Sequence, residues 1–464
     1  MPHPRRTALA SILLHTAVLA LLALPPASIP ATEFEWAFRA GGEGNDKIRG
    51  AAAGDHGAVF VTGEISGLAD FGDKRLQTVG KLDFVVAKID SRGKVLWASR
   101  SGGAEIDRGY GVSPAPDGGC YATGHFQSPS IAFGAAVLTN AGDYDGFVVR
   151  YDAQGSPVWA RRFGGKKYDY GHGIATLPDG SPVVAGALAG PGDVFGSRTA
   201  NAAGRSAILA RLTPSGKPTW SRIIHAPSAS GHNVATGPDG SIALCGYTRG
   251  AAVWPDGAGS ESRLQDIFVA KFDKSGKLLW RKDGGGAADG LATSVAIDRT
   301  DGAVVIAGMF KATAKFGPES FTSRGGHDFY MTTYAADGSF LAAHHGGGAE
   351  TDYALGAAAR PDGGFAITGE LSTVGEFNGR KHATAGTRDA ILATLDSAGA
   401  VSSFALAGGT DHDLSYAIAG TTDNAVVISG AFRKETRLGA HTLTAKSGND
   451  IFVAKARIRP GADE

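Results

Sequence analysis

An aspartate recurs four residues after a pair of adjacent glycines along most of this 464-residue chain. The series consists of Asp46, Asp107, Asp169, Asp352 and Asp413, with Asp289 displaced by one residue. A ring of such carboxylates could bind a cation or accept hydrogen bonds from the hydroxyls of a polyol. Short acidic side chains in loops also accept backbone hydrogen bonds within their own turns, and this structural role is the alternative.

Three residues after these aspartates, the residue type changes from repeat to repeat. The positions hold Arg49, Tyr110, His172, Leu355 and Tyr416, and the repeat that lacks the aspartate has His232-Asn233. Because a repeated scaffold explains what stays the same, the positions that differ are free for recognition, although ordinary surface variation would also produce them. We therefore predict a ligand site composed of Asp46, Arg49, Asp107, Tyr110, Asp169, His172, His232, Asp352, Asp413 and Tyr416.

Another acidic set precedes extended runs, and its members are expected to cap turns: Asp83, Asp145, Asp266, Asp328, Asp389 and Asp450. No spacing matches a calcium loop or a zinc motif, and no nucleophile, base and orienting residue form a set. Two carboxylates of a glycosidase could be present, but their separation decides that chemistry and the sequence does not give it. The sequence thus assigns no catalytic residue, no metal ligand and no cofactor.

These side chains recur because the chain itself is repetitive. Tryptophans stand at positions 36, 97, 159, 220 and 280, and Ala342 and Ser403 occupy the same place in the last two repeats. The spacing is 60 to 62 residues throughout. Such a regular period indicates one supersecondary unit that buries its apolar face only against its neighbours.

One repeat, residues 97–158, reads as two β-hairpins joined by an excursion, with turns at Asp117-Gly118 and Gln154-Gly155. Four short strands repeated seven times predict an all-β fold, a seven-bladed β-propeller of four-stranded blades. Residues 450–458 lack a following partner strand, and residues 33–38 lack a preceding one. We therefore expect the N- and C-terminal strands to pair and close the ring.

The runs Asp83-Phe-Val-Val-Ala-Lys88, Asp266-Ile-Phe-Val-Ala-Lys271 and Asp450-Ile-Phe-Val-Ala-Lys455 accompany the glycine pairs and the Asp-Gly turns. Together they resemble the SBBP (seven-bladed β-propeller) repeat proteins, which are mostly exported bacterial proteins. The segment from Ala87-Lys-Ile-Asp90 to Leu96-Trp97 resembles the tryptophan-docking repeat of quinoprotein dehydrogenases. That second resemblance implies that the tryptophans pack between neighbouring blades.

The N-terminal stretch has the order of a secretory signal peptide: Arg5 and Arg6, an apolar run over residues 8–24, then small residues to Ala31. A membrane anchor is the alternative. We expect residues 1–31 to be removed, with residues 32–464 forming a single monomeric propeller that is secreted, periplasmic or on the cell surface. Cys120 and Cys245 lie at different places in their repeats, so unpaired thiols are expected.

Lys plus Arg and Asp plus Glu both number 45, so no strongly charged partner such as nucleic acid is implied. The mature chain contains no further apolar run that could span a membrane. The sequence favours a binding or scaffolding module in the cell envelope or outside the cell, with a carbohydrate or protein ligand at the channel mouth. A secreted hydrolase of glycans or another polymer, using acidic residues at that mouth, is the alternative function.

Overall fold

The computed structural model describes residues 32–195 and 204–458, and most of them lie in β-strands. The predicted signal peptide, residues 1–31, lies outside the described residues. The described ranges contain no α-helix and one 3₁₀ turn, η1 (Asp55–Gly57), which leaves no helix in them that could cross a membrane.

The strands fall into four positions, counted outward from the centre of the molecule. The innermost strands are β2 (Lys47–Ala53), β8 (Asp107–Pro114), β14 (Tyr170–Thr176), β19 (Ser228–Thr236), β23 (Gly290–Ile297), β27 (Tyr353–Ala359) and β31 (Asp413–Gly420). The second strands are β3 (Val59–Ile65), β9 (Cys120–Phe126), β15 (Pro182–Ala189), β20 (Ile242–Val253), β24 (Val304–Phe316), β28 (Phe365–Phe377) and β32 (Ala425–Phe432).

The two outer positions follow in the same order. The third strands are β6 (Asp83–Ile89), β12 (Asp145–Tyr151), β17 (Arg205–Leu212), β21 (Gly259–Phe272), β25 (Glu319–Tyr334), β29 (Arg380–Leu395) and β35 (Asp450–Ile458). The fourth strands are β7 (Val95–Ser101), β13 (Pro157–Gly165), β18 (Pro218–Ile224), β22 (Leu278–Gly286), β26 (Phe340–Gly348), β30 (Val401–Ala407) and β1 (Thr32–Gly42).

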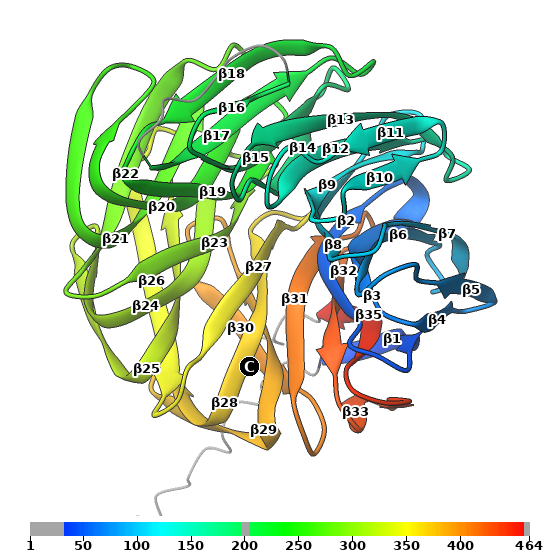
Figure 1. Ribbon diagram of the computed structural model, residues 1–464. Helices are drawn as coiled ribbons and strands as arrows, with labels where there is room; N and C mark the ends of the chain where they lie inside the picture. Colours follow the sequence, from blue (N-terminus) through cyan, green and yellow to red (C-terminus); the bar gives the residue numbers. More distant parts are fainter. Residues whose placement is uncertain (1–31, 196–203, 459–464) are drawn as a thin grey trace, which may run out of the picture.

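Within each unit, adjacent strands pair antiparallel from the innermost to the outermost. The unit of β31, β32 and β35 takes its fourth strand from the N-terminal end, because β1 pairs antiparallel with β35 and places Trp36 opposite Lys455. Figure 1 shows these sheets arranged around a common centre, which is the architecture of a β-propeller. The all-β propeller class predicted from the repeats is therefore confirmed.

Between the second and third strands the chain forms a further hairpin, where the sequence had indicated only an excursion. The separate hairpin strands are β4 (Leu68–Phe71), β5 (Lys74–Gln77), β10 (Ser130–Phe133), β11 (Ala136–Thr139), β33 (Glu435–Leu438) and β34 (His441–Thr444), and the short β16 is Gly192–Asp193. β4 pairs with β1, with Ala40 opposite Phe71, and β16 pairs in the same way with β13. The strands β4 and β16 thus join neighbouring sheets, whereas β10–β11 and β33–β34 form two-stranded sheets of their own.

The periodic tryptophans join each unit to the next. Trp36 Nε1 donates a 3.0 Å hydrogen bond to the carbonyl oxygen of Ser91, in the turn between β6 and β7. The indole also covers Gly93, which has a φ of +84°, and a Cβ there would lie 2.9 Å from the ring. Trp97, Trp159, Trp220 and Trp280 make the equivalent bond to the following turn. Their predicted structural role is confirmed.

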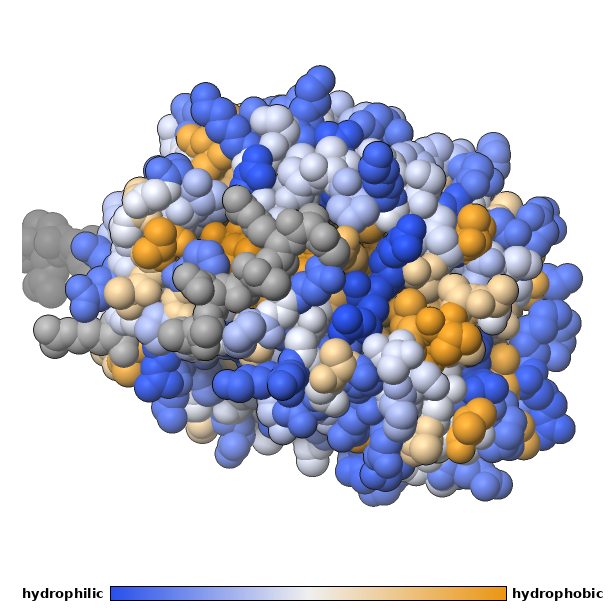
Figure 2. Space-filling view, turned by 45° about the horizontal axis from the view of Figure 1, so that its top comes forward, coloured by the Kyte–Doolittle hydropathy of each residue, from blue (hydrophilic) through white to orange (hydrophobic). Residues whose placement is uncertain are grey.

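Apolar side chains fill the space between successive sheets, as in the cluster of Phe84, Phe126 and Phe147. Cys120 and Cys245 are buried and unpaired, as predicted. On the face seen in Figure 2, hydrophobic residues form small groups among hydrophilic ones. The core therefore lies between the sheets, and it leaves the centre of the molecule to the innermost strands.

Candidate functional site: the central cavity

A cavity of about 550 Å³ runs between the innermost strands, and residues from all of them line it. Along its wall β2 lies beside β8, β8 beside β14, β14 beside β19, β19 beside β23, β23 beside β27, β27 beside β31, and β31 beside β2. The volume falls within the range that small-molecule ligands occupy. The backbone lining is tight, since a Cβ on Gly50 would lie 2.4 Å from the carbonyl oxygen of Tyr110.

Every innermost strand has a β-bulge at the same place. In β8 the register shifts between Gly109 and Gly111, and Tyr110 between them has no partner residue on β9. The other residues skipped in this way are Arg49, His172, His232, Thr293, Leu355 and Tyr416. A bulge bends its strand and redirects the extra side chain. Each bulged residue lines the cavity.

Five of the bulged residues form an unbroken chain of contacts across neighbouring strands, which we call the polar arc: Tyr416, Arg49, Tyr110, His172 and His232. The guanidinium carbon of Arg49 lies 5.5 Å from the ring centroid of Tyr416 and 5.1 Å from that of Tyr110. Ring centroids are 5.5 Å apart between Tyr110 and His172, and 4.6 Å apart between His172 and His232. The arc offers stacking surfaces and hydrogen-bonding groups together.

The remaining side of the cavity differs. Thr293 Oγ1 donates to the carbonyl oxygen of Ala354 at 2.6 Å, a bond that ties its strand to the neighbouring one. Leu355, the second bulged residue on this side, has no polar side-chain atom. On this side the β-bulges project few side-chain groups that could hydrogen-bond a polar ligand.

The histidines of the arc are held neutral. Burial and the nearby Arg205 lower the pKa of His172 to about 4. Burial, His172 and Arg205 lower the pKa of His232 as well. A neutral imidazole can donate one hydrogen bond and accept another, which suits sugar hydroxyls.

The predicted aspartates occupy a different place. Asp46, Asp107, Asp169, Asp352 and Asp413 are at most 1% exposed. None of them lines the cavity. Asp107 accepts hydrogen bonds from the backbone N–H groups of Gly103 at 2.8 Å and Gln127 at 3.2 Å, and Asp352 accepts them from Gly348 and Ser372. These carboxylates stabilise the glycine-pair turns by accepting backbone hydrogen bonds, which is the structural role considered above as the alternative. Their side chains are buried in the protein and do not reach the cavity.

Burial also changes the ionisation of these acids. It raises the pKa of Asp46 to about 6 and that of Asp169 to about 7, against the lowering effect of their backbone hydrogen bonds. Five members of the second acidic set cap turns as predicted, as where Asp83 accepts from the N–H of Val79 and Asp145 from that of Ala141. Among the described residues no backbone N–H donates to Asp266, the sixth member. The five buried aspartates of the first set are therefore inaccessible to a substrate, whereas Asp289 is exposed and Asp266 of the second set is partly exposed.

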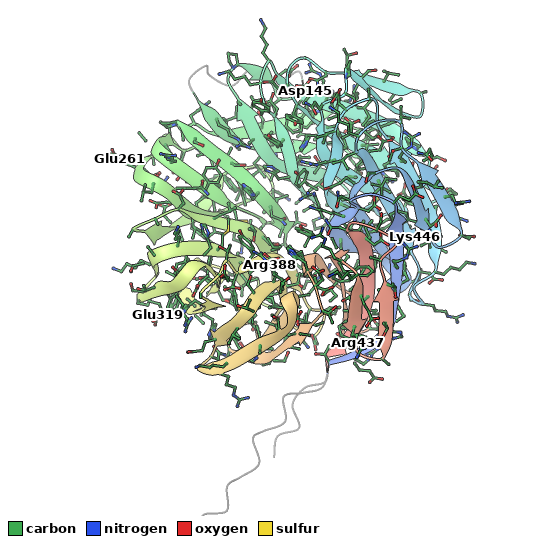
Figure 3. The ribbon with its side chains drawn as sticks, turned by 60° about the horizontal axis from the view of Figure 1, so that its bottom comes forward. Asp145, Glu261, Glu319, Arg388, Arg437 and Lys446 are labelled. Carbon is green, nitrogen blue, oxygen red and sulfur yellow. The ribbon has the colours of Figure 1, made fainter. Side chains whose placement is uncertain are left out.

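The structure adds residues that the sequence reasoning missed, because they come from other strands. Glu64 holds Arg49 in a bidentate ion pair, with Nη2 to Oε1 at 2.7 Å and Nε to Oε2 at 2.7 Å. Glu370 pairs with Arg388, which lies near the middle of the molecule in Figure 3, whereas Glu261 and Glu319 lie at its outer edge. His125 contacts Tyr110 across 5.3 Å between ring centroids.

A sequence signal for these residues existed. Glu64, His125, Tyr247 and Glu370 each follow the glycine of a second strand, and this position varies between repeats as the bulged position does. In the described ranges no group of three or more His, Cys, Asp or Glu side chains could hold a metal ion.

No family model matches the chain. A stretch of 146 residues is 27% identical to the regulatory protein FlaEY of Caulobacter vibrioides, covering 30% of this chain and 15% of FlaEY. The membership of the SBBP family thus stays a prediction.

Solved structures similar to this chain include U3-55K and Sqt1 from Chaetomium thermophilum. U3-55K is 9% identical with a TM-score of 0.45, covering 91% of this chain and 99% of its own. Sqt1 is 11% identical with a TM-score of 0.43, covering 92% of this chain and all of its own. At these values the likeness says nothing about ligand or activity.

Proposed function

We propose that this protein is a binding module whose carbohydrate ligand lies at the polar arc. The observation that supports this function is the chain of contacts from Tyr416 to His232, which joins the bulged residues of five neighbouring strands at one cavity. Tyrosine rings stack on the apolar faces of sugars, and neutral histidines exchange hydrogen bonds with hydroxyls. Residues far apart in the sequence thereby form one concave site without any long insertion.

We also propose that the protein is exported. The order of charged, apolar and small residues in 1–31 supports export to the cell envelope or beyond.

We further propose that the ring of blades is closed. The pairing of β1 with β35 supports a ring of seven blades formed by residues 32–464 as one monomeric domain, and so does the succession of innermost strands that returns from β31 to β2. Deleting residues 32–40 should then lower the unfolding midpoint and expose the edge of β35 to self-association. An unchanged midpoint would contradict closure.

A glycan array tests the function. The parent should bind one class of glycans, and the double variant Tyr110→Ala, His172→Ala should lose that signal. The matched control is Leu355→Ala, which shortens a bulged side chain on the other side of the cavity and should leave the signal in place. Binding that survives the double variant, or an array with no glycan bound and a protein ligand found instead, would overturn the proposal.

A further inference from the structure

Four basic side chains lie close to the polar arc, which itself contains Arg49: Lys47, Arg108, Arg205 and Arg388. Two carboxylates face them, and each is already engaged, Glu64 by Arg49 and Glu370 by Arg388. Arg108 Nε lies 3.8 Å from Glu64 Oε1 and has no hydrogen-bond partner. In the described part of the chain no carboxylate lies within 4.0 Å of Lys47 or Arg205. The arc thus has an excess of positive charge beside it.

His125 is a buried polar residue beside the polar arc. It is 1% exposed, and neither of its ring nitrogens has a hydrogen-bond partner. Tyr144 and Tyr170 flank it, each with its ring centroid 4.9 Å from that of the imidazole. A buried polar group without a partner costs about 1–3 kcal/mol. A bound polar ligand would relieve that cost.

Two of the basic residues, Arg108 and Arg205, lie near this histidine. Arg108 stands directly opposite His125 in the pairing of β8 with β9. Arg205 lies over Tyr170, with its guanidinium carbon 4.9 Å from the ring centroid, and its Nε has no hydrogen-bond partner. Burial and Arg108 hold the pKa of His125 well below its usual range, so the imidazole adds no charge of its own. The positive charge near His125 is therefore that of the Arg108 and Arg205 guanidinium groups.

We infer that the carbohydrate bound at the polar arc is an acidic saccharide, whose carboxylate groups are held by Arg108 and Arg205 beside His125. The inference rests on the proposed function and names the ligand class of that site. Guanidinium groups bind carboxylates with two parallel hydrogen bonds, which gives both strength and orientation. The neighbouring Tyr110 and Tyr170 rings would stack on the sugar rings that carry these carboxylates.

Calorimetric titration with oligomers of α-1,4-linked galacturonate and with their methyl esters tests the inference. Esterification removes the charge and leaves the sugar ring unchanged. We expect the free acid to bind at least tenfold more tightly than the ester, with a difference that narrows as salt is added. The double variant Arg108→Gln, Arg205→Gln should lower the affinity for the acid to that for the ester, without changing the latter.

The control Arg75→Gln, Arg437→Gln removes the same net charge from two exposed arginines and should change neither affinity. Equal affinity of the parent for acid and ester would overturn the inference while leaving carbohydrate binding in place. Binding of neither form would also overturn it, and the glycan array then decides the proposed function separately. Loss of affinity in the control as large as in the Arg108 and Arg205 variant would show a diffuse charge effect and contradict the assigned residues.

Discussion

The polar arc and the Thr293–Leu355 side of the central cavity are built on the same backbone. On both sides a β-bulge projects one residue into the cavity, as Tyr110 on β8 and Leu355 on β27 illustrate. On both sides a buried aspartate precedes the bulge by three residues, Asp107 in one case and Asp352 in the other. The repeated residues therefore build the scaffold, and the two sides of the cavity are distinguished by the residues that differ between repeats.

The difference between the two sides lies in what their side chains contact. Arg49 is shared between two tyrosine rings and a bidentate carboxylate, so it is held in place before any ligand arrives. Thr293 instead uses its hydroxyl to bond a neighbouring strand. A group fixed in advance loses less conformational entropy on binding, which favours the arc as the recognition surface.

The largest expected effect is a loss of unfolding free energy when a buried aspartate of the shared scaffold, Asp169, ionises. Burial raises the pKa of Asp169, which precedes His172 of the arc, from 3.8 to about 7. Since the folded-state pKa is the higher one, its stabilising contribution is complete below about pH 4 and is lost as the pH rises through about 7. A shift of about three units amounts to roughly 4 kcal/mol at most.

Chemical denaturation at about pH 4 and pH 8 measures this effect. The parent should lose more unfolding free energy over that interval than Asp169→Asn does. Equal losses in the two proteins would mean that the pKa of Asp169 is not raised in the folded state.

The buried aspartates should contribute equally to the free energy of unfolding on both sides of the cavity. Asp107→Ala and Asp352→Ala each leave buried backbone N–H groups without an acceptor, so each should lower the free energy of unfolding by about 3 kcal/mol. Asp73→Ala, at an exposed turn, is the control and should have almost no effect. A large cost on one side only would break the claim of a common scaffold.

Replacing a docking tryptophan should lower the free energy of unfolding equally on both sides of the molecule, and by less than replacing a buried aspartate. Trp97→Ala and Trp280→Ala remove half-buried indoles that bond to the following turn at 3.0 Å. We expect each to cost about 2 kcal/mol in urea denaturation, less than for a fully buried ring. Leu96→Ala, next to the first of them and exposed, is the control. A midpoint equal to that of the parent would show that the indole contact does not stabilise the sheet junction.

The smallest effect concerns extending the arc. Leu355→Tyr places an aromatic side chain at a bulge that now lacks one, and an added stacking contact is worth about 1 kcal/mol. Calorimetry should show an affinity for the glycan found on the array that is about fivefold higher. A tenfold loss would place Leu355 itself in contact with the ligand and erase the distinction between the two sides.

The repeats revealed the strands, the docking tryptophans and the variable positions before the fold was known. They could not reveal the direction of the aspartate side chains, since spacing places a residue in a turn without saying which way it points. The aspartates consequently lie in the turns, and the residues three positions later in the sequence line the cavity. The basic and aromatic surroundings of His125 depend on pairing between strands, as between Arg108 on β8 and His125 on β9, which no single repeat displays.

The most direct test of the central claim is to measure, by calorimetry, the affinity of three variants for the glycan that the parent binds. Tyr110→Ala, His172→Ala should weaken binding by at least tenfold, since residues at the centre of a site carry most of its binding energy. Leu355→Ala should stay within about twofold of the parent, as should Thr293→Ser, which keeps the hydroxyl bonded to Ala354. Equal losses on the two sides, or no loss in the first variant, would contradict the assignment of binding to the polar arc.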